Sequence, residues 1–262
     1  MTRRLTLWLT VVVLALGMAL PAGVAADTDP STKVYLALGD SLARGVGATD
    51  QEQGGYVPAL YAFFRQPQHG NVDQLVNEAV SGDTSGKLLN DGQLATAIEA
   101  INAPTDVRVV TLDIGGNDIR TLLAPGSPCL TNPSSAACQQ LVAAVLNDFA
   151  ANYAQTLGEL TQALEGDPGN ETVLVMTYYN PFSGTGLPID LLAEAAVRGL
   201  NSLIASIGGQ YGATIVDVYP LFERKGPLLT HILTGDIHPN DAGYQVIADA
   251  FISAYKPYGF EP

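Results

Sequence analysis

Cationic residues are scarce in this sequence. Only 12 of its 262 residues are Lys or Arg, against 26 Asp or Glu, and the formal net charge is −14. A chain this acidic is repelled at long range by nucleic acid and by anionic membrane surfaces. The composition therefore disfavours a protein that acts on nucleic acid.

Long hydrophobic runs are also rare, and the one clear example begins the chain. Arg3 and Arg4 precede an apolar stretch that ends before Pro21, and small residues follow up to Ala26. The stretch is shorter than the roughly 20 residues of a membrane-spanning helix, so we interpret residues 1–26 as a secretory signal peptide. The alternative is an uncleaved anchor. Cleavage predicts a secreted, extracellular protein without stable membrane insertion.

Cysteine and histidine are too few and too scattered to suggest a metal centre. Two Cys and three His offer no zinc-ligand spacing, and no other metal or cofactor is implied. Cys129 and Cys138 lie close together in a Pro/Ser/Asn-rich stretch, which in an exported chain predicts a disulfide. Two free thiols are the alternative.

Residues 27–262 show no repeat and no long linker, and 47% of the full sequence is hydrophobic, which suits one domain with one core. Short apolar runs predict strands at 33–39, 72–77, 107–113, 172–178 and 214–218. Apolar stripes predict helices over 141–164 and 189–207 and a last one from 239–240 to 255. Strands that alternate with helices indicate an α/β protein with a parallel sheet covered on both faces. We assign the helical stripes to core packing alone.

Ligands of such sheets bind beyond the carboxyl ends of the strands. Ser41 follows the first predicted strand directly, where a sharp turn would expose its hydroxyl; the alternative is a helix N-cap. Of the three histidines, His69 lies in a polar stretch and His231 fits either core or rim. His238 has Asp236 beside it and a proline after it, which favours it as a general base.

Two glycine-containing turns complete the set of candidate residues. Asn117 follows Gly115 and Gly116 at a predicted strand end, and Gly82 follows Ser81. Either turn has a plain structural interpretation. Ester hydrolysis by a serine nucleophile needs a base and hydrogen-bond donors for the oxyanion, and these loops contain both.

The chain resembles the SGNH hydrolases, also called the GDSL lipase/esterase family. Four family blocks occur in order, at 39–42, 77–82, 115–118 and 236–240. The resemblance implies a flavodoxin-like three-layer α/β sandwich with a five-stranded parallel sheet between helices. It also implies Ser41 as nucleophile, His238 as base, and an oxyanion hole built from the Ser41 and Gly82 N–H groups and the Asn117 amide.

One position departs from the family pattern. The triad aspartate usually stands three residues before the histidine, where this chain has Gly235, whereas Asp236 stands two before. We expect Asp236 to be the triad acid. The alternatives are a backbone carbonyl in its place, or Asp236 as a surface charge or helix cap.

The family serves lipids, acetylated sugars, aryl esters and thioesters, so the expected partner is a small-molecule, lipid or acetylated-sugar ester. An acyltransferase on the same site and a non-catalytic carbohydrate- or surface-binding protein on the same fold are the alternatives. Residues 82–87 look like a P-loop, but the glycines stand one residue too close and Leu88 replaces the magnesium-binding Ser or Thr. The loop 121–138 is poor in Leu and Phe, which predicts a preference for short acyl chains.

Overall fold

A computed structural model describes residues 32–166 and 171–256 of the protein. The predicted signal peptide, residues 1–26, lies outside the described residues. The strands are β1 (Lys33–Gly39), β2 (Gln74–Asn77), β3 (Asp106–Asp113), β4 (Thr172–Met176) and β5 (Thr214–Val216). The main helices are α1 (Tyr56–Phe64), α2 (Ser85–Asn90), α3 (Gln93–Asn102), α4 (Gly116–Arg120), α5 (Pro128–Thr131), α6 (Ala136–Leu164), α7 (Ile189–Gln210), α8 (Gly226–Leu229) and α9 (Asp241–Ala254).

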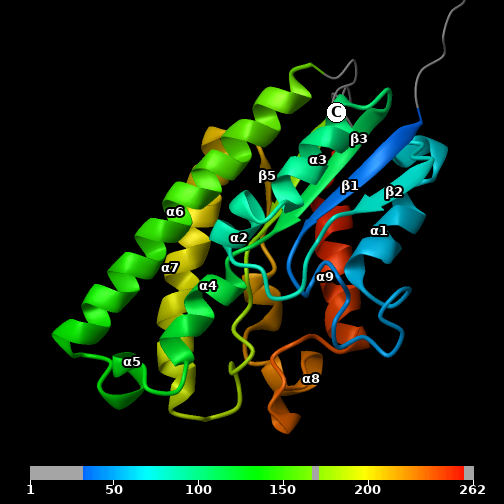
Figure 1. Ribbon diagram of the computed structural model, residues 1–262. Helices are drawn as coiled ribbons and strands as arrows, with labels where there is room; N and C mark the ends of the chain where they lie inside the picture. The colour runs from blue at the N-terminus through cyan, green and yellow to red at the C-terminus, as the bar shows by residue number, and fades with distance from the viewer. Residues whose placement is uncertain (1–31, 167–170, 257–262) are drawn as a thin grey trace, which may run out of the picture.

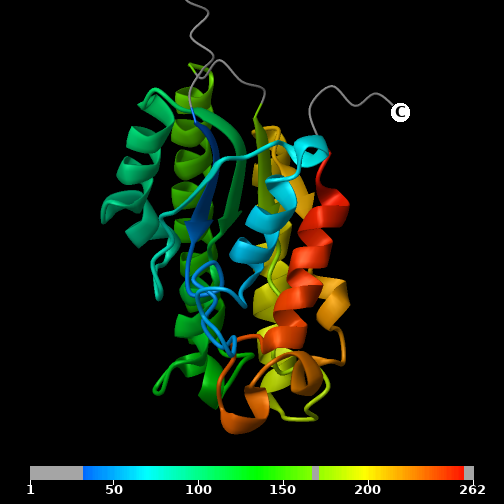
Figure 2. The same cartoon turned by 90° about the vertical axis from the view of Figure 1, so that its right-hand side faces the viewer.

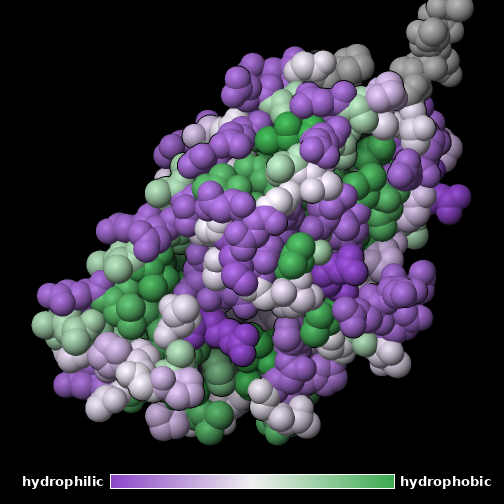
Figure 3. All heavy atoms as spheres, viewed as in Figure 1, coloured by the Kyte–Doolittle hydropathy of each residue, from purple (hydrophilic) through white to green (hydrophobic). Residues whose placement is uncertain are grey.

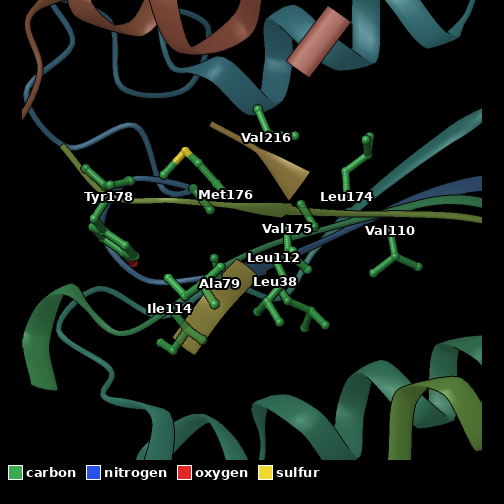
Figure 4. Packing of buried hydrophobic residues seen from close by; sticks show 14 of the residues in the cluster. Leu38, Ala79, Val110, Leu112, Ile114, Leu174, Val175, Met176, Tyr178 and Val216 are labelled. Carbon is green, nitrogen blue, oxygen red and sulfur yellow. The ribbon is translucent and has the colours of Figure 1, made fainter. Parts of the chain in front are cut away.

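The five strands form one parallel sheet in the order β2-β1-β3-β4-β5. The central strands are buried on both faces, which is why their sequences are continuous apolar runs rather than alternating ones. Figure 4 shows this packing, with Leu38, Leu112 and Val175 side by side in the sheet. The predicted parallel α/β sandwich is confirmed.

Helices cover both faces of the sheet (Figures 1 and 2). α1 packs on α9 on one face, whereas α2, α3, α6 and α7 pack together on the other. α7 is long and apolar enough to cross a membrane by length and composition, but here it packs against α6, β4 and β5. In Figure 3, hydrophobic residues gather over the first half of α6, and hydrophilic residues cover most of the same face.

The segment 121–138 is more ordered than its composition predicts. A 3-10 turn (η2, Thr121–Leu123) and the short α5 lie within it, and α6 begins at Ala136 rather than near residue 141. Ser127 and Ser135 accept hydrogen bonds from the backbone N–H groups of Cys129 and Cys138, so each serine caps a helix. Cys129 and Cys138 form a disulfide, with Cα atoms 4.7 Å apart, that ties α5 to the first turn of α6.

Candidate active site

Ser41 lies in a tight turn at the carboxyl end of β1. The Arg44 and Val46 N–H groups donate to the carbonyls of Asp40 and Ser41, at 3.3 and 3.0 Å, which folds residues 40–46 back on themselves. The next helix, α1, begins only at Tyr56, so Ser41 does not cap a helix. The turn leaves Ser41 half-buried in the wall of a pocket.

The residue before this turn, Gly39, must be glycine because a neighbouring strand lies against it. Gly39 has φ +148° and pairs in register with Asp113 at the end of β3. A Cβ atom on Gly39 would lie 2.3 Å from Asp113 Oδ1, far inside contact distance. Any other residue at position 39 would therefore displace the Asp113 carboxyl group.

His238 comes from the connection between α8 and α9, almost two hundred residues from Ser41. Its backbone carbonyl accepts from the His231 N–H at 3.0 Å, and the Ile237 carbonyl accepts from the Tyr179 hydroxyl at 3.0 Å. Asn240, not Asp236, caps α9 by accepting from the Gly243 N–H. The loop is thus fixed on both sides of His238, and Asp236 is left free to interact with the imidazole.

Ser41, His238 and Asp236 form a continuous chain of polar contacts. The Ser41 hydroxyl lies 2.9 Å from His238 Nε2, and Asp236 Oδ1 lies 2.5 Å from His238 Nδ1. Asp236 Oδ1 also accepts from the His238 backbone N–H at 3.1 Å. Burial opposes ionisation of Asp236, but these hydrogen bonds outweigh it and hold the pKa of the carboxyl below its ordinary value.

The other two histidines serve the structure elsewhere. His231 Nε2 lies 2.8 Å from the Gly47 carbonyl, so its ring holds the far end of the serine turn. His69 stacks on Phe63 with ring centroids 3.8 Å apart. Neither contacts Ser41, which agrees with the choice of His238 as the candidate base.

Three predicted oxyanion donors surround the same pocket. Ser41, Gly82 and Asn117 all line it. Within residues 32–166 and 171–256, the backbone N–H groups of Ser41 and Gly82 donate to no protein acceptor. Asn117 Nδ2 donates to the Asp83 carbonyl at 2.9 Å and makes only a long 3.4 Å contact with Asp40, so one of its two hydrogens is weakly engaged.

Residues 82–87, which resemble a P-loop, donate hydrogen bonds to the side-chain carboxylate of Asp118. Asp118 accepts from the Ser85 N–H at 2.9 Å and from the Ser85 hydroxyl at 2.6 Å. Thr84 caps the short helix that follows. These contacts, together with the Asn117–Asp83 hydrogen bond, lock the Gly82 turn to the start of α4.

Behind the serine turn lies a pair of buried carboxyl groups that the sequence analysis does not identify. Asp40 accepts from the Leu42 N–H at 3.0 Å and the Tyr178 hydroxyl at 2.8 Å, and Asp113 accepts from the Tyr56 hydroxyl. Asp40 and Asp113 are within hydrogen-bonding reach of each other. Burial and the adjacent Asp40 raise the pKa of Asp113 well above its ordinary value.

The raised pKa of Asp113 favours the protonated form of its carboxyl group. Asp113 Oδ2 is buried without a hydrogen-bond partner among the described residues, and an uncharged carboxyl oxygen is less costly to bury in this way than a charged one. Asp40 faces the Leu42 N–H and the Asn117 amide. The one signal in the sequence that could have identified Asp113 is an acid at the end of an apolar strand.

The pocket has a volume of about 490 Å³, within the range of roughly 300–1,000 Å³ usual for small-molecule sites. Ser41, His238, Gly82 and Asn117 line it together with apolar side chains from α4, from α7, from the serine turn and from the segment after β4. No three His, Cys, Asp or Glu side chains of the described segments are grouped so as to hold a metal ion.

Known proteins resemble this chain in sequence and in fold. The family model of the GDSL-like lipase/acylhydrolase family matches residues 37–246. A spore germination lipase, LipC, from Bacillus licheniformis is 23% identical over 230 residues, which are 85% of this chain and 96% of LipC.

Solved structures share the fold. A lipase from a goat rumen metagenome superimposes with a TM-score of 0.65 at 22% identity, over 85% of this chain and 97% of that one. An acetylxylan esterase from Geobacillus stearothermophilus gives 0.59 at 20% identity, over 88% and 96%. The same architecture therefore occurs in a lipase and in a deacetylating esterase.

Proposed function

Because this chain belongs to the GDSL-like lipase/acylhydrolase family and is thus a carboxylic ester hydrolase of the esterase/lipase type, we propose that it is an exported serine esterase that works through an acyl-enzyme on Ser41. The observation that carries the proposal is the contact chain from Ser41 Oγ through the His238 ring to Asp236, with distances of 2.9 and 2.5 Å. These three groups come from two loops far apart in the sequence.

In the first half-reaction Ser41 Oγ attacks the ester carbonyl carbon while His238 Nε2 takes the hydroxyl proton. The Asp236 carboxylate accepts from Nδ1–H, which fixes the tautomer that leaves Nε2 free to accept. Negative charge then develops on the former carbonyl oxygen, facing the Ser41 and Gly82 N–H groups and the Asn117 amide. Collapse breaks the bond to the alcohol oxygen, which receives the proton from His238.

In the second half-reaction a water molecule replaces the alcohol. His238 takes a proton from the water as its oxygen attacks the acyl carbon, and the same donors receive the second oxyanion. Collapse returns the proton to Ser41 Oγ and releases the carboxylic acid. An alcohol in place of water would yield a new ester, which is the transferase alternative.

Export is part of the proposal and rests on two features. Residues 1–26 have the basic start, apolar middle and small-residue end of a signal peptide, which leaves 27–262 as the hydrolase domain. The Cys129–Cys138 disulfide suits an oxidising compartment.

The direct test is hydrolysis of nitrophenyl esters by the mature protein and by Ser41→Ala, with products analysed in water and with added alcohol. We expect free acid from the wild type and no turnover above background from the variant, with an unchanged melting temperature. Full activity in Ser41→Ala would refute the proposal. Ester formation that exceeds hydrolysis at low alcohol concentration would favour the transferase.

A further inference from the structure

Six of the apolar side chains that line the pocket belong to neighbouring elements, and the sequence analysis assigns the stripe of 189–207, from which some of them come, to core packing alone. They come from α4, from the 3-10 turn after it, and from the first two turns of α7: Ile119, Leu123, Ile189, Ala193, Ala196 and Val197. Ala193, Ala196 and Val197 are only 3, 5 and 4% exposed. We call these six residues the α4–α7 wall. Arg120 also lines the pocket, but its side chain is exposed.

The arrangement of groups in the tetrahedral intermediate decides which part of a substrate contacts this wall. In the tetrahedral intermediate the oxyanion faces Gly82 and Asn117, and the departing oxygen faces His238, which must protonate it. The acyl chain takes the remaining direction, away from His238. α4 packs on α7, to the left in Figure 1, whereas the connection between α8 and α9, which carries His238, lies to the right. The acyl chain is therefore directed at the α4–α7 wall.

The size and chemistry of the wall then set the substrate class. An acetyl group would fill little of a 490 Å³ pocket and would leave the apolar side chains of α7 unused. Each methylene buried on such a surface is worth about fourfold in kcat/KM. The small side chains of Ala193 and Ala196 leave room along the first turns of α7, where larger residues would close the pocket.

We propose that the α4–α7 wall is an acyl-chain subsite and that the protein prefers esters of medium-length fatty acids, with about six to ten carbons, over acetate. This inference rests on the proposed function, and it revises the expectation of short acyl chains drawn from the composition of residues 121–138. The apolar wall comes from α7 rather than from that segment.

The test measures kcat/KM for nitrophenyl acetate, butyrate, octanoate and palmitate at matched solubility, in the wild type and three variants. Ala193→Leu places a larger side chain on the wall and should lower the octanoate/acetate ratio at least tenfold. Val197→Ala should shift the preferred chain towards longer acids. Ala195→Leu makes the Leu substitution at an exposed position of the same helix and should leave the ratio unchanged.

Failure of this inference is distinct from failure of the proposed function. Faster turnover of acetate than octanoate by the wild type, or equal ratios in Ala193→Leu and Ala195→Leu, would overturn the acyl subsite and leave the serine esterase standing. No turnover of any ester, with no phosphonate adduct on Ser41, would overturn the proposed function itself.

Discussion

At the scale of single residues, the account depends on how an imidazole is held by a carboxylate only two positions before it. Asp236 reaches both the backbone N–H and Nδ1 of His238 with one oxygen. The preceding Gly235 has φ +87°, a conformation that suits glycine and turns the chain sharply there. With this turn, the Asp236 carboxylate reaches the imidazole although it stands one position later than the acid of the family pattern.

We therefore expect Asp236→Asn to lose activity through misorientation of His238. The expected loss in kcat is on the order of 10⁴, as in the serine-protease template. The matched control is Asp241→Asn, which should retain activity. Asp241 begins α9, shortly after His238, and its carboxylate accepts hydrogen bonds from Thr49. A kcat for Asp236→Asn within about tenfold of wild type, the order of one hydrogen bond, would instead favour a backbone carbonyl.

The buried pair Asp40–Asp113 makes a prediction about pH. Because the pKa of Asp113 is raised in the folded protein, the folded state binds more protons than the unfolded chain once the pH exceeds the ordinary carboxyl pKa of about 3.9. The stabilisation that Asp113 contributes is complete when the pH is below the ordinary carboxyl pKa. It falls as the pH rises towards the raised pKa of Asp113 in the folded protein.

Asp113→Asn keeps a donor towards Asp40 and an acceptor for Tyr56, but it does not titrate. The stability of wild type minus that of the variant should therefore decrease as the pH rises from about 4 to 8. Urea unfolding of both proteins across this range measures the difference. A difference that stays constant or grows with pH would show that Asp113 is ionised in the folded protein.

At the scale of elements, the Cys129–Cys138 disulfide joins α5 to α6 beside the turn that carries Leu123 on the pocket wall. Both cysteines are buried. The bridge closes a short loop, so its stabilisation should fall at the low end of the usual range.

We expect Cys129→Ser with Cys138→Ser to lower the free energy of unfolding by about 2–3 kcal/mol. Activity towards acetate should decline less than activity towards octanoate, because only the longer chain reaches Leu123. Thermal unfolding and the same ester panel measure both effects. Stability equal to wild type, or two alkylatable thiols in the folded wild type, would contradict the role of the bridge.

The strands and the long helices could be predicted from sequence because each is one uninterrupted pattern. The first predicted strand, 33–39, matches β1, and the end of α6 at Leu164 matches the last residue of the apolar stripe. The predicted strands extend two residues too far at the start of β2 and at the ends of β4 and β5. The helices α2, α4, α5 and α8 are too short for a period to be visible.

The parts of the site that sequence could not supply are those that depend on distant packing. Ser41 and Asn117 stand out because polar residues follow predicted strands, and His238 stands out because an acid and a proline lie beside it. Asp113 became visible only when β1 and β3 were paired, and Ala193 only when α7 was placed against α4. An alanine in a helical stripe looks the same whether it faces the core or a substrate pocket.

At the scale of the whole molecule, the acidic charge is consistent with the proposed export and cleavage of residues 1–26. Loss of Arg3 and Arg4 with the leader brings the formal charge to about −16, since the leader contains no acidic residue. Such a charge keeps an extracellular protein soluble and away from anionic surfaces.

Expression of the full chain in a secreting bacterial host should therefore yield protein in the medium that begins at Asp27. N-terminal sequencing and intact mass measure the cleavage site. Retention of residues 1–26 on membrane-bound protein would indicate the anchor instead of a signal peptide.

The central claim is that Ser41 is the nucleophile activated by His238, and a fluorophosphonate probe tests it most directly. Intact mass and peptide mapping of the labelled mature protein should show one adduct, on Ser41. The adduct should be absent in Ser41→Ala, form far more slowly in His238→Ala, and form at the wild-type rate in His69→Ala, whose ring lies away from the site. Labelling of another residue, or equal labelling rates in His238→Ala and wild type, would contradict the account.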